Sequence, residues 1–268
     1  GHRLSFISQP PLREQPYFFK PPANLVKRQA LALEIQKLLD KGAIEEVHKV
    51  TPGFYGSIFL VPKKSSGKWR PVCNLKRLNP HLLVPRFKME TTKSITISLK
   101  PGHWTTSIDP QDAYMHIPIH VKSRRYLRFG FQGRVYQYKT LPFGLSTAPY
   151  VFTRTTKSVA AYVHSLGLDY HHYLDDWLNQ AASFPQAQEQ TSFLLDLTMS
   201  LGWVPNFTKS ELIPKQVFTF IGIFADLIKG MVFPPEDRLY KIQQAVTHLL
   251  QNQGATAHFY MHIIGLLT

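Results

Sequence analysis

Cysteine is nearly absent from this chain of 268 residues, in which Cys73 is the only one. A single thiol cannot form an internal disulfide, so a disulfide-stapled fold and a cysteine-rich zinc site are both excluded. No apolar run reaches about 18 residues, so we expect no membrane-spanning helix and no membrane partner. The first residues lack the apolar core of a signal peptide, which favours an intracellular setting and leaves cytoplasm and nucleus undistinguished.

Acidic residues are scarce, with 17 Asp and Glu against 31 Lys and Arg and a net charge of +14. The imbalance is concentrated in the first 100 residues, which carry 18 basic and 6 acidic side chains. A basic first third beside a nearly neutral remainder indicates a surface for a polyanion such as nucleic acid, although it could serve solubility alone. Because the chain begins without Met and ends in an apolar run, we expect a segment of a longer protein.

Helix and strand signals alternate along the sequence after a Pro-rich and aromatic stretch at 9–22, which we expect to be extended. The helices that we expect, each with a capping residue or a terminating glycine, cover 24–40, 146–167, 185–201 and 235–253. The expected strand pairs are 57–62 with 69–75, 126–131 with 135–138, 170–174 with 177–179, and 218–225 with 231–233. One further strand is expected at 104–109. This alternation predicts an α+β fold.

Two adjacent acids, Asp175 and Asp176, interrupt an apolar and aromatic stretch from Tyr170 to Leu178. Two like charges about 4 Å apart repel by roughly 4 kcal/mol at an effective dielectric constant of 20. A divalent cation reverses the sign of that cost. The pair therefore indicates half of a metal site, and Asp109, at the end of another expected strand, is the candidate for the missing carboxylate. Taken alone, Asp109 fits the role of a residue in a strand-end turn better than that of a metal ligand.

Six motifs follow one another along the chain, and together they are specific where each alone would be weak. In order they are 63–78, 107–114, 141–149, Tyr-Leu-Asp-Asp at 173–176, 201–210 and 220–222. This order resembles the reverse transcriptase family of retroviruses and retrotransposons over about residues 25–235. The details of 144–149 and 173–178 are most similar to DIRS-like elements, and next to gypsy-type long-terminal-repeat elements.

The resemblance implies the right-hand polymerase fold, an α+β architecture with palm, fingers and a partial thumb. It divides the chain into an N-terminal arm at 1–23, fingers at 24–85, palm at 86–113, fingers and palm at 114–145, palm at 146–234, and a truncated start of the thumb or connection at 235–268.

The same resemblance implies roles for the acidic residues. Asp109 and Asp175 would bridge two Mg²⁺ ions, for which Mn²⁺ is a possible substitute, and Asp176 would complete the metal environment. Lys209 would donate a proton to the leaving pyrophosphate, although it could also be an ordinary surface lysine.

Other motif residues would bind the nucleotide and the primer. Lys63 and Arg70 would contact the phosphates of the incoming nucleotide. Tyr114 would exclude a 2′-hydroxyl, although it could instead be a core aromatic. Phe143 and Gly144 would pack near the nascent base pair. The expected primer grip consists of Phe220, Ile221 and Gly222.

The implied function is that of an RNA-directed DNA polymerase, with dNTP and a primed RNA or DNA template as partners. The alternatives are a domesticated, catalytically idle nucleic-acid-binding relative and an RNA-directed RNA polymerase, against which Tyr114 argues. Ribonuclease H activity is expected only in a downstream domain of the parent protein, because no further set of spaced carboxylates follows Asp176. Oligomeric state is not indicated.

Overall fold

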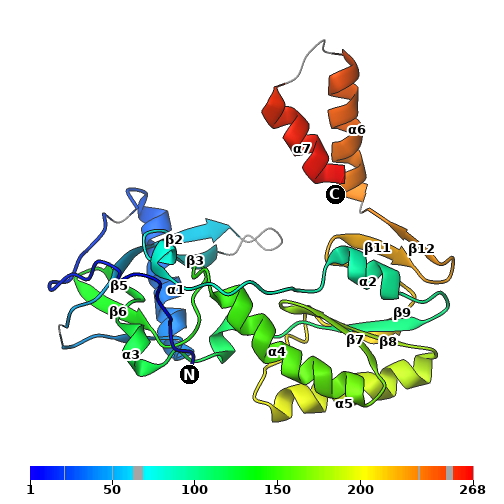
Figure 1. Ribbon diagram of the computed structural model, residues 1–268, viewed down its shortest axis with the longest axis horizontal. Coiled ribbons are helices and arrows are strands. Elements are labelled where there is room, and N and C mark those ends of the chain that lie inside the picture. Colours follow the sequence, from blue (N-terminus) through cyan, green and yellow to red (C-terminus); the bar gives the residue numbers. More distant parts are fainter. Residues whose placement is uncertain (21, 50, 63–68, 235, 252–255, 268) are drawn as a thin grey trace. The chain divides into compact units, whose positions relative to one another are not determined.

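The computed structural model describes the chain apart from residues 21, 50, 63–68, 235, 252–255 and 268 (Figure 1). Two compact units are formed, each from segments that are distant in sequence. The first comprises Gly1–Met89, Pro110–Ala161 and Met199–Val204. The second comprises Glu90–Asp109, Tyr162–Thr198 and Pro205–Thr268. Lys63 and the rest of the expected basic turn lie outside the described residues.

The first unit contains a five-stranded sheet in the order β1-β6-β5-β2-β3. These strands are β1 (Ile44–Glu46), β2 (Tyr55–Pro62), β3 (Trp69–Asn74), β5 (Arg128–Phe131) and β6 (Arg134–Tyr138). The two expected hairpins, β2 with β3 and β5 with β6, are antiparallel, and the parallel pairing of β2 with β5 joins them. The first hairpin carries Arg70 on β3, paired with Val61.

Helix α1 (Leu25–Asp40) contacts three strands of this sheet. Its N-cap is Asn24, whose side-chain oxygen accepts a hydrogen bond from the Lys27 amide at 3.0 Å, as the sequence predicted. Leu31, Ile35 and Leu38 form its buried face. The remaining helical segments of this unit are η1 (Asn79–His81), η2 (Ala113–His116), α3 (Val121–Arg124) and the first part of α4 (Ala148–Ser165).

The N-terminal residues run along the first unit without forming a regular strand. Isolated bridges pair His2 with Ile119 and Phe6 with Leu82, and Leu4 between them is buried. These contacts show that residues 2–6 pack within the first unit.

The second unit contains a four-stranded sheet in the order β7-β8-β4-β9. The strands are β4 (Trp104–Ile108), β7 (Asp169–Tyr173), β8 (Asp176–Ala181) and β9 (Glu211–Lys215), and all pairs are antiparallel. Helix α5 (Phe184–Ser200) covers one face, where Thr191 hydrogen bonds to Thr106, and α2 (Thr92–Ser98) covers the other (Figure 1). The sequence predicted β4, β7, β8 and α5, but it did not predict α2 or β9.

The single strand expected at 218–225 is wrong. The chain instead makes a turn at Ile221 and Gly222, with φ of 39° and 79°, between β10 (Val217–Phe220) and β11 (Ile223–Asp226). Two consecutive residues at positive φ are typical of a two-residue hairpin turn, in which Gly carries no steric cost. With β12 (Met231–Phe233), these strands form a three-stranded antiparallel sheet rather than one hairpin.

The C-terminal part of the second unit forms two helices, α6 (Glu236–Gln251) and α7 (Ala257–Leu267), which contact each other. The sequence predicted the first, but not the second. No helix among the described residues is both long and apolar enough to cross a membrane.

One buried amide of the central sheet is unsatisfied. Asn179 on β8 is 2% exposed, and neither atom of its amide has a hydrogen-bond partner among the described residues. The neighbouring Gln180 is 1% exposed, but its amide receives the Lys100 N–H at 2.8 Å and donates to the Ser98 carbonyl at 3.1 Å. A buried polar group without a partner costs about 1–3 kcal/mol.

We therefore expect Asn179→Leu, which replaces the amide by an apolar group of similar size, to raise the free energy of unfolding by about 1 kcal/mol. Gln180→Leu is the matched control and should lower it, because two backbone groups lose their partner. Urea unfolding followed by circular dichroism measures both. A loss of stability in Asn179→Leu would contradict this account of the core.

Candidate active site

Asp109 directly follows β4 in the second unit and is held through its backbone. Its amide donates to the Ser210 hydroxyl at 3.0 Å, and its carbonyl accepts the Asn206 amide at 2.7 Å. The Lys209 ammonium lies 3.6 Å from the Asp109 carboxylate. The segment before β9 therefore fixes Asp109, and the role of Asn206 in this was not apparent from the sequence.

Asp175 and Asp176 lie at the turn between β7 and β8, in the same unit. Leu174 adopts a left-handed conformation, with φ of 51°, and its carbonyl accepts the indole N–H of Trp177 at 2.9 Å. Since β4 and β8 pair Ile108 with Trp177, the same antiparallel register sets Asp109 opposite Asp176. Strand pairing thus brings the three aspartates to one end of the sheet.

The carboxylates perturb one another. Burial, followed by the charges of Asp175 and Asp109, raises the pKa of Asp176 from 3.8 to about 6, and the charge of Lys209 opposes this. Burial also raises the pKa of Asp109; the Lys209 charge opposes that rise and the Asp175 charge adds to it. Such coupling indicates a cluster of negative charge that a cation would stabilise.

The raised pKa of Asp176 makes the stability of the folded chain depend on pH. Because the pKa of Asp176 is higher in the folded chain, the folded state binds the proton more tightly between pH 3.8 and about 6. The stability that protonation of Asp176 contributes is therefore lost as the pH rises through that window. Asp176→Asn removes the charge that the folded state disfavours.

We expect Asp176→Asn, in metal-free protein, to raise Tm at pH 8 and to leave it nearly unchanged at pH 4. The gain should be only about 1 kcal/mol, because Asp176 is desolvated on its protein side but exposed on the other, where solvent screens its charge. Thermal unfolding in EDTA at both pH values measures it. Asp169→Asn, which loses an exposed ion pair with Lys100, is the control and should bring no gain. An equal difference at both pH values would contradict the expectation.

No three His, Cys, Asp or Glu side chains in the described part of the chain are grouped closely enough to hold a metal by themselves. The donors that are present are carboxylate oxygens, which suit hard cations. Mg²⁺ in particular is usually held by one or two carboxylates together with substrate phosphates and water. The chemistry of the aspartate cluster therefore fits Mg²⁺ bound jointly by protein and substrate.

A second group of expected site residues lies in the first unit. The Arg70 guanidinium stacks over the Phe143 ring at 4.6 Å, and Phe143 contacts Tyr114 with ring centroids 5.1 Å apart. Tyr114 also contacts the buried Phe152 at 5.4 Å. The sequence named Arg70, Phe143 and Tyr114 separately, whereas their stacking into one column was not apparent from it.

The backbone conformation and the close packing at position 144 require a glycine. Its φ is 102°, and a Cβ there would meet the Cys73 carbonyl oxygen at 2.3 Å. The Gly144 carbonyl accepts a hydrogen bond from the side-chain amide of Asn79 at 2.9 Å. The loop that carries Phe143 is thereby held against β3, which carries Arg70.

The residues expected to grip the primer lie at the β10–β11 turn of the second unit. Phe220 is 6% exposed and packs with Ile95 and Leu178 in a small core cluster, which Ile221 flanks. Gly222 has open space around its α-carbon. Phe220 is thus a core residue here, whereas Ile221 and Gly222 form the turn itself.

Comparison with known proteins identifies the family. Residues 61–224 match the model described as reverse transcriptase (RNA-dependent DNA polymerase). The Gag-Pol polyprotein of bovine immunodeficiency virus (strain R29) is 28% identical over 242 residues, which is 87% of this chain but 16% of that protein. The retrovirus-related Pol polyprotein from transposon 412 of Drosophila melanogaster is 30% identical over 127 residues, or 45% of this chain and 10% of that protein.

Solved structures of reverse transcriptases have a similar fold. A foamy viral protease-reverse transcriptase in complex with dsDNA has a TM-score of 0.77 at 19% identity, covering 98% of this chain and 53% of that one. The same enzyme in complex with an RNA/DNA hybrid has a TM-score of 0.74 and covers 98% and 32%. The predicted α+β fold of a right-hand polymerase is confirmed. With a family model that matches 61–224, the chain belongs to the reverse transcriptase (RNA-dependent DNA polymerase) family.

Proposed function

We propose that this chain is the polymerase domain of a reverse transcriptase, which adds deoxynucleotides to the 3′-hydroxyl of a primer on an RNA or DNA template. The observation that carries the proposal is the aspartate cluster in a member of this family. Asp109 directly follows β4 and Asp176 begins β8, beside the pair Ile108–Trp177; Asp175 adjoins them, and their charges are coupled.

The cofactor in this proposal is a pair of Mg²⁺ ions, with Mn²⁺ as a possible substitute. Asp109 and Asp175 would bind both ions, and Asp176 would complete the set. Bound metal would activate the primer hydroxyl and stabilise the charge of the reacting phosphates. Lys209, which is 63% exposed beside Asp109, would donate a proton to the departing pyrophosphate.

The incoming nucleotide would be recognised by the column of Arg70, Phe143 and Tyr114. Arg70 would bind phosphate oxygens with its planar fork of donors, together with Lys63. Tyr114 would leave no room for a 2′-hydroxyl, and so would select deoxynucleotides. Phe143, between them, would pack against the new base pair with Gly144.

The partners follow from the relatives, whose solved structures hold dsDNA or an RNA/DNA hybrid. Fingers at 24–85 and 114–145, palm at 86–113 and 146–234, and the start of a thumb from 235 would hold such a duplex, with 220–222 against the primer. Since the matched relatives are far longer polyproteins, we propose a parent protein with a downstream ribonuclease H domain. Its source would be a retrotransposon, DIRS-like in the first place and gypsy-type in the second.

Primer extension on a poly(rA) template with an oligo(dT) primer and Mg²⁺ tests this function. Incorporation by the wild type that disappears in Asp175→Asn is the expected result. No incorporation by the wild type, or equal incorporation by the variant, would contradict the proposal.

A further inference from the structure

Strand β7 leads directly into the turn with Asp175 and Asp176, and it lies at an edge of its sheet. The order β7-β8-β4-β9 gives it one neighbour, and no described strand pairs with its other side. Polar backbone groups on an open edge have no ladder to hold them, so edges open more readily than central strands. The strand that delivers two of the aspartates would therefore need another support.

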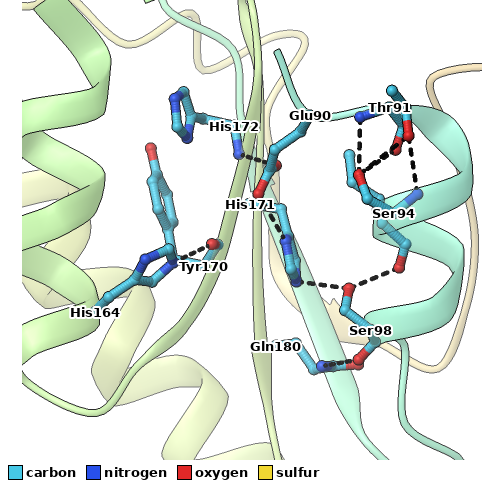
Figure 2. A network of polar contacts seen from close by, with 10 residues as sticks. Glu90, Thr91, Ser94, Ser98, His164, Tyr170, His171, His172 and Gln180 are labelled. Atoms are coloured by element: carbon cyan, nitrogen blue, oxygen red, sulfur yellow. Dashed lines mark hydrogen bonds and ion pairs between the residues drawn. The ribbon is translucent and has the colours of Figure 1, made fainter. Parts of the chain in front are cut away.

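Two side chains provide contacts along that open edge (Figure 2). The amide of His172 donates to a Glu90 carboxylate oxygen at 2.9 Å. Two residues earlier, the carbonyl of Tyr170 faces the His164 Nε2 atom at 2.6 Å. Because a carbonyl only accepts, His164 must carry its proton on Nε2 and donate it. The backbone N–H and C=O groups of residues 170 and 172 point to the same side of the strand, so both contacts lie on one edge.

The second oxygen of Glu90 faces His171 Nδ1 at 3.3 Å, and His171 Nε2 lies 2.9 Å from the Ser98 hydroxyl. This order, serine to histidine to carboxylate, is that of a hydrolytic triad. Ser98, however, has one proton, which it donates to the Ile95 carbonyl at 2.6 Å. His171 Nε2 must then be the donor to Ser98, so the serine is not activated as a nucleophile. With the ring protonated on both nitrogens, His171 donates from Nε2 to Ser98 and from Nδ1 to Glu90, and so links Glu90 to helix α2.

Helix α2 is in turn tied to the sheet. The Ser98 carbonyl accepts the Gln180 amide group from β8 at 3.1 Å, and Gln180 also receives the Lys100 N–H. Burial alone would raise the pKa of Glu90, but hydrogen bonds and charge from His171 and His172 hold that pKa below its usual value. A lowered pKa keeps Glu90 charged, and helix α2, to which it is linked, is itself hydrogen bonded to β8.

We propose that Glu90 and His164 are positioning residues that clamp the outer edge of β7, and so fix where the strand delivers Asp175 and Asp176. The contact made by Glu90 is to His172, which lies three residues before Asp175 and two before the left-handed Leu174. This inference rests on the proposed function, since it assigns the clamp to the same aspartates. Supporting residues around a metal site commonly change activity or metal affinity by about 10–100-fold when they are removed.

Single-nucleotide incorporation kinetics on a primed RNA template test the clamp. In Glu90→Ala we expect kcat to fall by about 10–100-fold, and the Mg²⁺ needed for half-maximal rate to rise, with KM for dNTP and primer–template affinity unchanged. Glu90→Gln should retain most of the rate, because its amide oxygen still accepts the His172 N–H. Asp169→Ala removes an acid from the same strand whose side chain pairs with Lys100, and it should behave as the wild type.

Hydrogen exchange of the metal-free protein gives a second readout that does not involve activity. A peptide covering 169–178 should exchange faster in Glu90→Ala than in the wild type and in Asp169→Ala. A peptide covering β4 should be unchanged, since it lies inside the sheet. Faster exchange confined to β7 and its turn identifies loss of the clamp rather than loss of the fold.

His164→Phe is the second variant, should Glu90→Ala not fold. It keeps an aromatic ring beside Tyr170 but lacks the donor, so we expect the same fall in kcat and the same faster exchange. Wild-type kcat and wild-type exchange in the folded variants would overturn the clamp. An inactive wild type, or an Asp175→Asn as active as the wild type, overturns the proposed function instead, and exchange alone then decides whether the clamp exists.

Discussion

Asp175→Asn is expected to reduce nucleotide incorporation by about 10³-fold or more, which is the largest effect predicted for this chain. Asn keeps the size of the side chain but replaces a charged ligand by a neutral amide. Charge stabilisation by a catalytic metal amounts to several kcal/mol, and a loss of about 4 kcal/mol corresponds to about a thousandfold in rate. The loss should fall on kcat, with primer–template affinity preserved.

The matched control is Asp169→Asn, which neutralises an acid at the other end of the same strand. Its side chain is 42% exposed and pairs with Lys100 at the surface, so incorporation should remain at the wild-type level. Circular dichroism of both variants separates chemistry from folding. A variant at Asp175 with more than a tenth of wild-type kcat would remove the aspartate from the assigned metal site.

Tyr114→Ala is expected to lower the preference for deoxynucleotides over ribonucleotides by about 10–100-fold, because the ring would no longer occupy the space of a 2′-hydroxyl. The ring is held between Phe143 and Phe152, at 5.1 and 5.4 Å, so it cannot easily turn aside. The measurement is the ratio of kcat/KM for dNTP and rNTP on one primer–template.

Tyr114→Phe is the control, since it retains the ring and should retain the preference. Discrimination that is unchanged in Tyr114→Ala, with both proteins folded, would remove the gate from Tyr114 without affecting the assignment of the aspartates. Discrimination lost equally in Tyr114→Phe would point to the hydroxyl rather than the ring.

Much of the fold was accessible from the sequence where local signals are strong. Asn24 marks the start of α1 by its side-chain cap, and the paired aspartates mark the β7–β8 turn. The prediction failed at Ile221 and Gly222, because a β-branched residue at positive φ is rare and the apolar run 218–225 reads as one strand. Helix α7 was not predicted either, although Thr256 directly before it acts as a cap: its hydroxyl accepts the Phe259 amide at 3.3 Å.

The sequence by itself supplied the candidate groups for the chemistry: six ordered motifs, three candidate aspartates and a basic first third. Only the tertiary structure decided which of these groups meet. The pairing of Ile108 with Trp177, almost 70 residues apart, sets Asp109 opposite Asp176, and the contact of Glu90 with His172 supports the edge of β7. Both depend on strand register and on side chains distant in sequence. Local propensity encodes neither, because register follows from the burial of a whole sheet face.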